Sequence, residues 1–315
     1  MKIVFMGTPD AAVPTLQKIL EDGHEVVAVW TQPDRPSGRG RKLKAPPVKE
    51  FALKYDLEVF QPLKIKTKES IELFKSHKAN VAVVVAYGRI LSKSYLNAFT
   101  LGCINVHFSL LPKYRGAAPV NWAIVNGETK TGITTMQMDL GLDTGNILQQ
   151  SEIAIGGKEN SIELMEKFSV QGAEILSETL EKYKEITPIE QNDSEASFAP
   201  ILSKKDGLID WSLSAEEINN RVRGFQPFPG SYTFYQGKKI TIWQAKVWKT
   251  DSDDSTVDKN VGKIISANKK DFFIKCGKNS ILQVLELQIE GKRRMETQDF
   301  LNGIKINAGE MMENE

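Results

Sequence analysis

The chain has 315 residues, more than one ordinary hydrophobic core accommodates, so two domains are expected. It carries 41 basic and 40 acidic residues, and this net charge of +1 excludes a global attraction to nucleic acid or to a membrane surface. Cys103 and Cys276 stand far apart without a CxxC or His-rich pattern, which favours a reducing cytosol over a disulfide framework or a zinc site. The amino terminus does not have the pattern of a signal peptide, and no apolar run has the length of a membrane span. We therefore expect a cytoplasmic protein with no membrane partner.

The first half of the chain alternates apolar runs with amphipathic segments, which is typical of strands joined by crossover helices in a mostly parallel sheet. Strands are predicted over residues 2–7, 24–32, 58–62, 80–88, 103–108 and 132–139. Helices are predicted over residues 10–21, 47–55, 67–76, 117–126 and 161–183. The sequence thus predicts an N-terminal α/β domain of the Rossmann-like kind.

The turn after the first predicted strand argues against a dinucleotide site. A dinucleotide fingerprint needs three glycines at GxGxxG spacing, so that pyrophosphate can approach the amino end of the helix. The corresponding GTPD contains only Gly7, and a GxxxxGK[ST] phosphate loop is absent from the chain. We therefore expect neither a nicotinamide nor a flavin cofactor.

The periodicity fades over residues 186–206, a polar stretch long enough to connect two domains. Beyond it, one short helix precedes alternating segments separated by Gly, Asn and Lys turns, which indicate a small closed or nearly closed, OB-like β-barrel. We predict an α/β domain over residues 1–188, a linker over 189–206 and a barrel over 207–315.

Polar side chains stand where two predicted strands end. Asn105 and His107 are two residues apart, so they share one face of the sheet, and ligands of open parallel sheets lie beyond the carboxyl ends of strands. Taken alone, each is more often a satisfied polar group under a loop, and Asp143 in MDLGLDTGNIL is an ordinary turn former. The coincidence of an amide, an imidazole and a carboxylate favours a catalytic site.

A second local signal is basic. Residues 35–49 contain no acidic side chain, and their basic side chains are Arg35, Arg39, Arg41, Lys42, Lys44 and Lys49. Such a run is most often a solvated loop. Its place directly after a strand, together with its glycines and prolines, favours a flexible loop that becomes ordered on meeting a polyanion.

The stretches NVHFSLLPKYRGAAPVNWAI and TTMQMDLGLDTGNIL are similar to the folate-dependent formyltransferase superfamily, whose members share an Asn-x-His pair, a Ser-Leu-Leu-Pro turn and a downstream Asp. FMGTPD, TQPDRPSGRGRKLKAPPVK, VVVAYG and SKKDGLIDWSLSAEEINNRVRGFQPFPG resemble the members that formylate methionyl initiator tRNA. The resemblance extends over nearly the whole chain. It implies the formyltransferase fold, 10-formyltetrahydrofolate as formyl donor and methionyl initiator tRNA as the partner that accepts the formyl group.

The resemblance also implies roles for the polar residues. The methionyl α-amine would attack the formyl carbon directly, giving a tetrahedral intermediate whose oxyanion Asn105 stabilises by about 3 to 4 kcal/mol. His107 would hold a proton for that oxyanion or for the departing folate nitrogen. Asp143 would orient the imidazole and favour its charged form. Neither a nucleophilic side chain nor a metal is expected.

Binding residues follow from the same resemblance. Folate binding is assigned to Tyr87, Gly88, Ile90, Ser109, Leu110, Leu111, Pro112 and Asp139. The tRNA acceptor end is assigned to Arg35, Arg39, Arg41, Lys42 and Lys44, with Arg39 expected to matter most. In the predicted barrel, residues 238–239, 269–270 and 292–294 are candidates for RNA contact.

Two other classes of function stay open. One is a nucleic-acid-binding protein on an inactive α/β scaffold. The other is a folate-dependent hydrolase or an amino-sugar formyltransferase on the same core. For the chain itself we expect a monomer.

Overall fold

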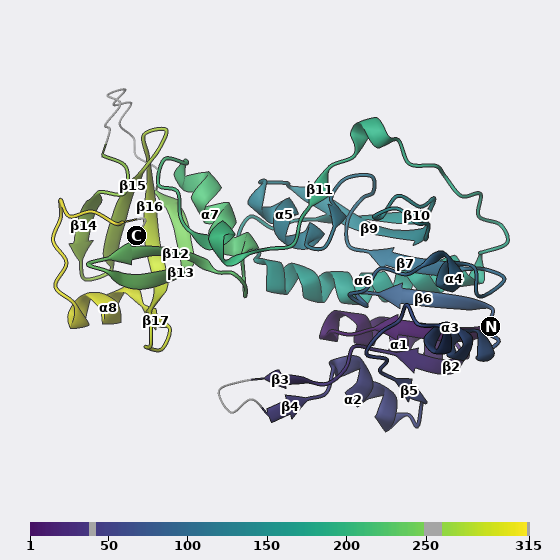
Figure 1. Cartoon of the computed structure of the whole chain (residues 1–315). Coiled ribbons are helices and arrows are strands. Elements are labelled where there is room, and N and C mark those ends of the chain that lie inside the picture. The colour runs from purple at the N-terminus through teal and green to yellow at the C-terminus, as the bar shows by residue number, and fades with distance from the viewer. Residues whose placement is uncertain (38–41, 249–259, 314–315) are drawn as a thin grey trace. The chain divides into compact units, whose positions relative to one another are not determined.

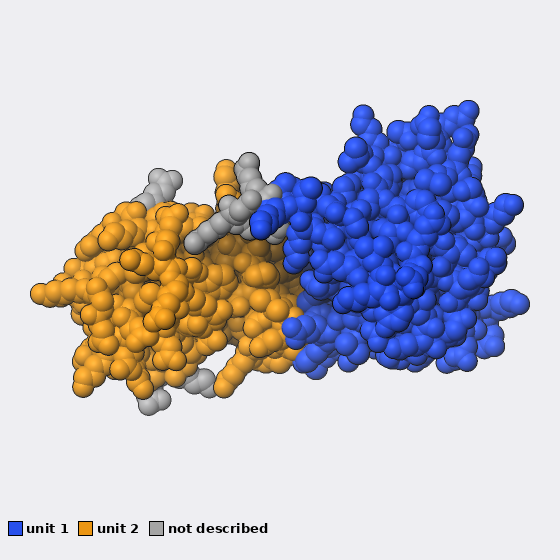
Figure 2. All heavy atoms as spheres, turned by 90° about the horizontal axis from the view of Figure 1, so that it is seen from below, with its two compact units in different colours: residues 1–119, 130–154, 165–199 blue, residues 120–129, 155–164, 200–315 orange. Residues whose placement is uncertain are grey.

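The computed structural model describes residues 1–37, 42–248 and 260–313 (Figure 1). The chain folds into two compact units, which Figure 2 colours separately. Unit 1 comprises residues 1–119, 130–154 and 165–199, and unit 2 comprises residues 120–129, 155–164 and 200–315. The chain therefore passes between the units several times. The predicted division at residues 188 and 207 stays a prediction.

Unit 1 is built on a seven-stranded sheet with the strand order β10-β9-β7-β6-β1-β2-β5. Its strands are β1 Lys2–Gly7, β2 Glu25–Trp30, β5 Val59–Phe60, β6 Val81–Val85, β7 Cys103–His107, β9 Lys130–Gln137 and β10 Ile147–Ala154. The pairs from β5 to β7 are parallel, whereas β9 runs antiparallel to both β7 and β10. The mostly parallel α/β sheet is confirmed, and β10 is a strand that the sequence patterns did not predict.

Helices cover both faces of this sheet. They are α1 Val13–Glu21, which follows the 3-10 turn η1 Asp10–Ala12, and α2 Pro47–Lys54, α3 Lys68–Ser76, α4 Lys93–Leu96 and α6 Ser161–Glu181. Phe74 of α3 and Tyr95 of α4 belong to one core cluster with Cys103 of β7. On the opposite face, Gly172 of α6 packs so closely that a Cβ there would lie 3.2 Å from Val106. Because side chains alternate along a strand, residues 105 and 107 lie on the face of Cys103.

Two short ladders complete unit 1. β3 (Arg35–Ser37) pairs antiparallel with β4 (Lys42–Lys44), so residues 35–37 and 42–44 of the basic stretch form strands rather than loop, and its last residues lie in α2. β8 (Arg115–Gly116) pairs parallel with β11 (Phe198–Ala199), which follows the 3-10 turn η2 (Asp193–Glu195). The second ladder ties the polar stretch after α6 to the loop after β7.

Unit 2 contains an antiparallel sheet in the order β12-β13-β16-β15-β14, with β17 paired to β16. Its strands are β12 Ser231–Tyr235, β13 Lys238–Trp248, β14 Ile264–Asn268, β15 Asp271–Cys276, β16 Ser280–Ile289 and β17 Met295–Glu296. The remaining helices are α5 Pro119–Val125, η3 Lys204–Gly207, α7 Ala215–Gly224 and α8 Thr297–Gly303. Glu313 exchanges two backbone hydrogen bonds with Phe234 of β12, and Ile264 of β14 donates to Glu310. The C-terminal segment thus bridges the two edge strands and nearly closes the predicted small barrel.

No helix within the described ranges has both the length and the apolar character needed to cross a bilayer.

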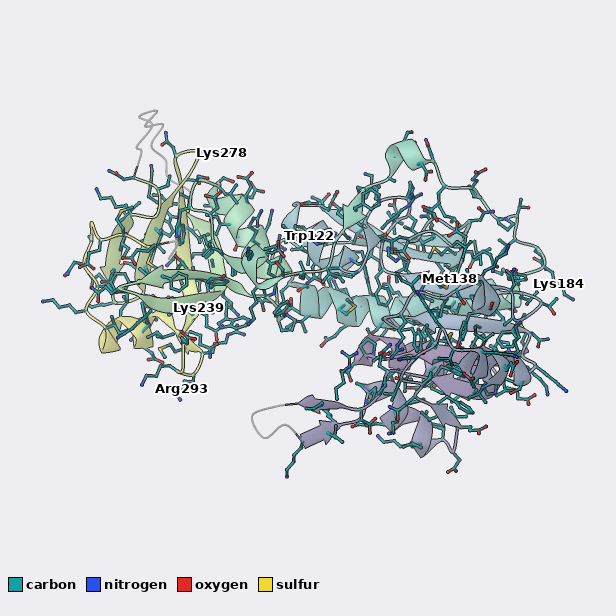
Figure 3. The ribbon with its side chains drawn as sticks, in the orientation of Figure 1. Trp122, Met138, Lys184, Lys239, Lys278 and Arg293 are labelled. Atoms are coloured by element: carbon teal, nitrogen blue, oxygen red, sulfur yellow. The ribbon has the colours of Figure 1, made fainter. Side chains whose placement is uncertain are left out.

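Helix α7 begins with a capping box. The Ser214 hydroxyl accepts a hydrogen bond from the backbone N–H of Glu217, and the Glu217 carboxylate accepts from both the N–H and the hydroxyl of Ser214. Lys278, in the turn between β15 and β16 (Figure 3), lies 3.1 Å from both carboxylate oxygens. These bonds, led by the one from the Ser214 hydroxyl, lower the pKa of Glu217 from 4.5 to about 2.

We predict that Glu217→Ala lowers the free energy of unfolding at neutral pH by about 1 kcal/mol, the usual cost of losing a helix cap. The lowered pKa means that this contribution is complete above pH 4.5 and is lost as the pH falls toward 2. Urea unfolding at about pH 7 and about pH 3 measures the difference from wild type at each pH. Glu216→Ala, in the same turn, is the matched control. A difference of equal size at both pH values would contradict the role of the ionised carboxylate.

Candidate active site

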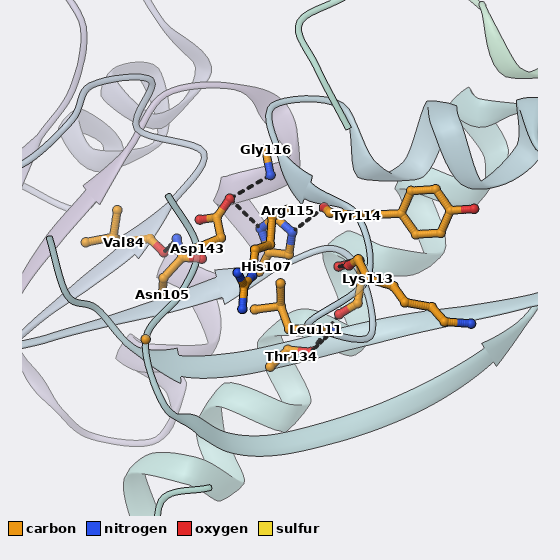
Figure 4. Close-up of polar contacts among 12 residues, drawn as sticks. Val84, Asn105, His107, Leu111, Lys113, Tyr114, Arg115, Gly116, Thr134 and Asp143 are labelled. Carbon is orange, nitrogen blue, oxygen red and sulfur yellow. Dashed lines mark hydrogen bonds and ion pairs between the residues drawn. The ribbon is translucent and has the colours of Figure 1, made fainter. Parts of the chain in front are cut away.

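Asn105, His107 and Asp143 come together in unit 1 (Figure 4). The Nδ1 atom of His107 lies 3.7 Å from Oδ2 of Asp143, and its Nε2 lies 3.0 Å from the carbonyl oxygen of Tyr114. A carbonyl oxygen only accepts, so Nε2 carries the proton in that bond. The imidazole therefore lies between a carbonyl oxygen and a carboxylate oxygen, and His107 itself is buried, with 6% of its surface exposed.

Strand β7 places the amide beside the imidazole. Asn105 pairs in register with Val84 of β6, and its Nδ2 donates to the Val84 carbonyl oxygen at 3.0 Å. Its Oδ1 is buried without a hydrogen-bond partner among the residues that the structure describes. The neighbouring strand thus fixes one N–H of the amide and with it the orientation of the side chain.

Residues with left-handed backbone provide both contacts of His107. Tyr114 has a φ of 60° and Asp143 a φ of 54°. Each of these two backbone conformations costs about 1 to 3 kcal/mol and persists only where the surrounding structure imposes it. At Gly116, whose N–H donates to Oδ2 of Asp143 at 2.8 Å, an added Cβ would lie 2.5 Å from the carbonyl oxygen of Ala199. Only glycine allows β8 to approach β11 this closely, and β8 in turn holds the Asp143 carboxylate.

The Ser109–Pro112 turn is braced from β9. Thr134 Oγ1 donates to the Ser109 carbonyl oxygen at 2.6 Å and accepts from the Leu111 N–H at 3.1 Å. Gln150 of β10 donates to Thr134 Oγ1 at 3.0 Å and to the Leu111 carbonyl oxygen at 2.8 Å. Ser109 and Leu111 are buried, and the Ser109 hydroxyl donates to the Lys113 carbonyl oxygen. Sequence reasoning missed Thr134 and Gln150, because a polar residue within a strand gives no local sign of its partners.

The loop after β6 contains the other residues predicted to bind folate. Tyr87 is buried, and burial raises its pKa to about 12. Its carbonyl oxygen accepts from Thr8 Oγ1 and Gln32 Nε2. Gly88 has a φ of 79°, and Ile90 is 75% exposed. The loop therefore combines a fixed backbone with an exposed apolar side chain.

Asp139 closes its own loop. Its carboxylate accepts from the Gly141 N–H at 3.0 Å and from the Thr144 hydroxyl at 2.7 Å. It therefore organises the loop after β9, and it is Asp143 that faces His107.

The polar stretch after α6 also contributes to the site. Gln191 Nε2 donates to the carbonyl oxygens of Asp143 and Gly145, at 2.9 Å and 2.7 Å. Its Oε1 accepts from Arg115 Nε and Nη2, at 3.0 Å and 2.8 Å. Ser197 Oγ accepts from the Tyr114 N–H at 2.9 Å. Sequence reasoning missed these residues, since a polar stretch of low periodicity resembles a tether.

The basic stretch divides into exposed and internally paired residues. Arg39 and Arg41 lie outside the described residues, and Arg35, Lys42 and Lys44 are exposed. Lys49, in contrast, lies 2.9 Å from both carboxylate oxygens of Asp34 and 2.8 Å from Gln61 Oε1. Hydrogen bonds from Gln61 and Lys49 lower the pKa of Asp34. The base of the β3–β4 hairpin is thereby anchored to the body of unit 1.

In unit 2, some basic side chains contact aromatic rings and others line a surface hollow. Lys239 Nζ lies 3.8 Å from the centre of the Tyr232 ring, and the Arg294 guanidinium lies 5.2 Å from the Trp243 ring, so both cations contact aromatic faces. A surface hollow of about 520 Å³ is lined by Lys238, at the start of β13, and by Lys292 and Arg293, between β16 and β17. The carboxylates of Glu290 and Asp299 line the same hollow. Figure 3 shows the Arg293 side chain at the β16–β17 end of the sheet.

The described residues contain no group of three or more His, Cys, Asp and Glu side chains that is placed to hold a metal ion. Cys103 and Cys276 are free and buried, and burial raises the pKa of each thiol to about 12. Both thiols are therefore protonated at neutral pH and are poor nucleophiles.

Comparison with known proteins gives the family. Residues 1–180 match the formyl transferase family, and residues 201–305 match the formyl transferase C-terminal domain. The chain is 46% identical over 311 residues to the methionyl-tRNA formyltransferase of Geobacter sulfurreducens, covering 98% of this chain and 96% of that protein. It is 47% identical over 315 residues to that of Caldanaerobacter subterraneus subsp. tengcongensis, covering 99% and 100%.

Solved structures show the same fold at much lower identity. The sugar 3N-formyl transferase WlaRD superposes with a TM-score of 0.65 at 19% identity, covering 93% of this chain and 99% of that chain. The N-formyltransferase of Helicobacter canadensis superposes with a TM-score of 0.63 at 19% identity, covering 90% and 98%. The fold, the matches to both family models and the relatives that align over nearly their whole length agree. The chain belongs to the methionyl-tRNA formyltransferase family.

Proposed function

We propose that this chain transfers the formyl group of 10-formyltetrahydrofolate to the α-amine of methionyl initiator tRNA, the modification that prepares the tRNA for initiation of translation. The observation that carries the proposal is the imidazole of His107, held between the Asp143 carboxylate and the Tyr114 carbonyl beside the Asn105 amide. This arrangement serves proton transfer and stabilisation of an oxyanion, which are the needs of transfer between two nitrogen atoms.

The reaction needs no nucleophilic side chain, because the substrate amine is the nucleophile. Its nitrogen forms a bond to the formyl carbon, and the bond from that carbon to the folate nitrogen breaks. The amine loses a proton and the folate nitrogen gains one. The Ser109 hydroxyl is engaged with the Lys113 carbonyl oxygen and Cys103 is buried, so neither is assigned a covalent role.

The three polar groups take separate roles in this transfer. The N–H of Asn105 that does not bond Val84 donates to the oxyanion, an interaction commonly worth about 3 to 4 kcal/mol. His107 passes the proton to the oxyanion or to the leaving nitrogen. Asp143 stabilises the charged imidazole and fixes its orientation.

We assign folate to the loops after β6 and β9 and to the Ser109–Pro112 turn. The support is the Tyr87 carbonyl held by two hydrogen bonds, the exposed side chain of Ile90 and the loop that Asp139 closes. Backbone groups there are suited to pair with the edge of the pterin ring. Tyr87, Leu110 and Leu111 then act through backbone and apolar contact.

We assign the tRNA acceptor end to the β3–β4 hairpin, with Arg35, Arg39, Arg41, Lys42 and Lys44 as its contacts. The support is the exposure of Arg35, Lys42 and Lys44 and the anchored base of the hairpin. In the C-terminal domain, which we propose begins near residue 207, three basic residues line one hollow, against two acidic ones. We assign phosphate contact to the basic three, Lys238, Lys292 and Arg293. We further propose that the protein acts as a monomer in the cytoplasm, where proteins are synthesised.

Transfer to an amino sugar is the second candidate, because WlaRD, of similar fold, is a sugar formyl transferase. That relative is 19% identical, whereas the methionyl-tRNA formyltransferase of Geobacter sulfurreducens is 46% identical. Incubating the purified protein with 10-formyltetrahydrofolate and each acceptor in turn separates the two. Formylmethionyl-tRNA as product supports the proposal, and formyl sugar with unmodified tRNA overturns it.

We predict that Asn105→Ala and His107→Ala lower kcat for formylation by about 100-fold or more, since each removes a group that acts in the transition state. The dissociation constants for folate and tRNA should change much less. Steady-state formylation measured beside tRNA filter binding tests this. Both variants keep binding and lose turnover if the site is catalytic. An RNA-binding protein on an inactive scaffold would instead give an inactive wild type.

We predict that Arg39→Ala weakens the use of tRNA and makes its salt dependence shallower, because one fewer phosphate-bound counterion is released. The KM for tRNA measured at several salt concentrations reports the slope. Lys49→Ala is the internal comparison, because the Lys49 charge is already paired with Asp34 and should contribute less to that slope. An unchanged slope in Arg39→Ala would count against phosphate contact at this position.

A further inference from the structure

We infer that Gln191 is a positioning residue for Asp143, and this inference rests on the proposed formyl transfer. Gln191 lies in the polar stretch after α6, which sequence patterns treat as a tether between domains. It is 8% exposed, and hydrogen bonds engage both ends of its side-chain amide. The same stretch therefore serves the active site of unit 1.

The orientation of the Gln191 amide is determined by its partners. Oε1 faces the Nε and Nη2 atoms of Arg115, which can only donate. Nε2 faces the carbonyl oxygens of Asp143 and Gly145, which can only accept. A flipped amide would place oxygen against two oxygens and N–H groups against a guanidinium. The side chain consequently has one satisfactory orientation.

Arg115 makes this arrangement obligatory. Its side chain is buried, with 4% of the residue exposed, so the guanidinium needs acceptors within the protein. Gln191 supplies one, and Asp193, whose side chain is 83% exposed, supplies another at 2.8 Å. Because the Asp193 carboxylate is largely solvated, we assign the orienting role to the buried amide.

Asp143 is thereby held at both its carboxylate and its backbone. The carboxylate accepts from the Gly116 N–H, and the carbonyl oxygen accepts from Gln191. Gly116 and Arg115 are consecutive residues of β8, and β8 pairs with β11 of the polar stretch. These contacts maintain the left-handed φ of 54° that turns the Asp143 carboxylate toward His107.

The other contact of His107 depends on the same stretch. The Tyr114 N–H donates to Ser197 Oγ at 2.9 Å, and the Arg115 N–H donates to the Ser197 carbonyl oxygen at 2.8 Å. The two acceptors on either side of the imidazole are thus both braced by residues between 191 and 199. Loss of the Gln191 amide should release the Asp143 side while Ser197 keeps the Tyr114 side in place.

The test uses formylation by the full-length protein with methionyl initiator tRNA and 10-formyltetrahydrofolate, measured as kcat and KM across a pH series. Gln191→Met preserves length and removes every hydrogen bond of the amide. We expect kcat to fall by about 10- to 100-fold, the usual result of slightly misplacing a catalytic group. KM for both substrates should stay within about 2-fold. The alkaline limb of the pH–rate profile should move to lower pH, because a displaced carboxylate no longer favours the charged imidazole.

Two further variants make the result specific. Gln191→Glu keeps an acceptor for Arg115 and loses both donors to Asp143 and Gly145, so it should reproduce the loss of kcat even if Gln191→Met folds poorly. Asp193→Asn weakens the exposed partner of Arg115 and leaves Gln191 in place, so its kcat and pH profile should match wild type.

A fall in kcat without a shift of the pH profile in either Gln191 variant would overturn the inference, because it would show a purely structural role. Wild-type rates in Gln191→Glu would overturn it as well. Failure of the proposed function looks different, since the wild-type protein itself would then form no formylmethionyl-tRNA.

Discussion

The contact between the His107 imidazole and the Asp143 carboxylate depends on backbone conformations that the rest of unit 1 must impose. Asp143 and Tyr114 both lie in the left-handed region, where residues other than glycine are rarely found. Neither residue would stay there in an isolated loop. The pair therefore exists because Gly116, Gln191 and Ser197 fix the backbone on both sides of the imidazole. The geometry of the candidate site is thus a product of tertiary contacts more than of the local sequence around His107.

The features that the sequence predicts well are those that depend on periodicity. The apolar runs of β1, β6 and β7 are buried strands because a central parallel sheet is covered on both faces. Spacing by two places Asn105 and His107 on one face, and the structure brings Asp143 to them. In contrast, β10 escaped prediction because polar residues interrupt it, and only Ile147, Leu148 and Ile153 of the strand are buried. The sheet pairing with β9 decides its conformation.

The features that the sequence does not predict are buried hydrogen bonds between residues that are far apart in the chain. Arg115 and Gln191 are separated by 76 positions, and Gln191 and Asp143 by 48. No local pattern distinguishes such a glutamine from a solvated one, because its role is determined by partners that only the fold brings near. Lys49 shows the same difficulty for a charged residue. It belongs to the basic run in the sequence, and only the fold shows that its ammonium group is paired with the Asp34 carboxylate and hydrogen-bonded to Gln61.

The chemistry explains why such bonds are concentrated around one imidazole. When the substrate supplies its own nucleophile, the protein does not need an activated thiol or hydroxyl, and both cysteines are buried with raised pKa values. What remains for the protein is to hold donors and acceptors where charge develops, and fixed dipoles act most strongly when they need not reorganise. The stretch after α6 serves this need directly. Its contacts with β8 and with the loop after β9 make the segment that leads to the C-terminal domain a part of the candidate active site.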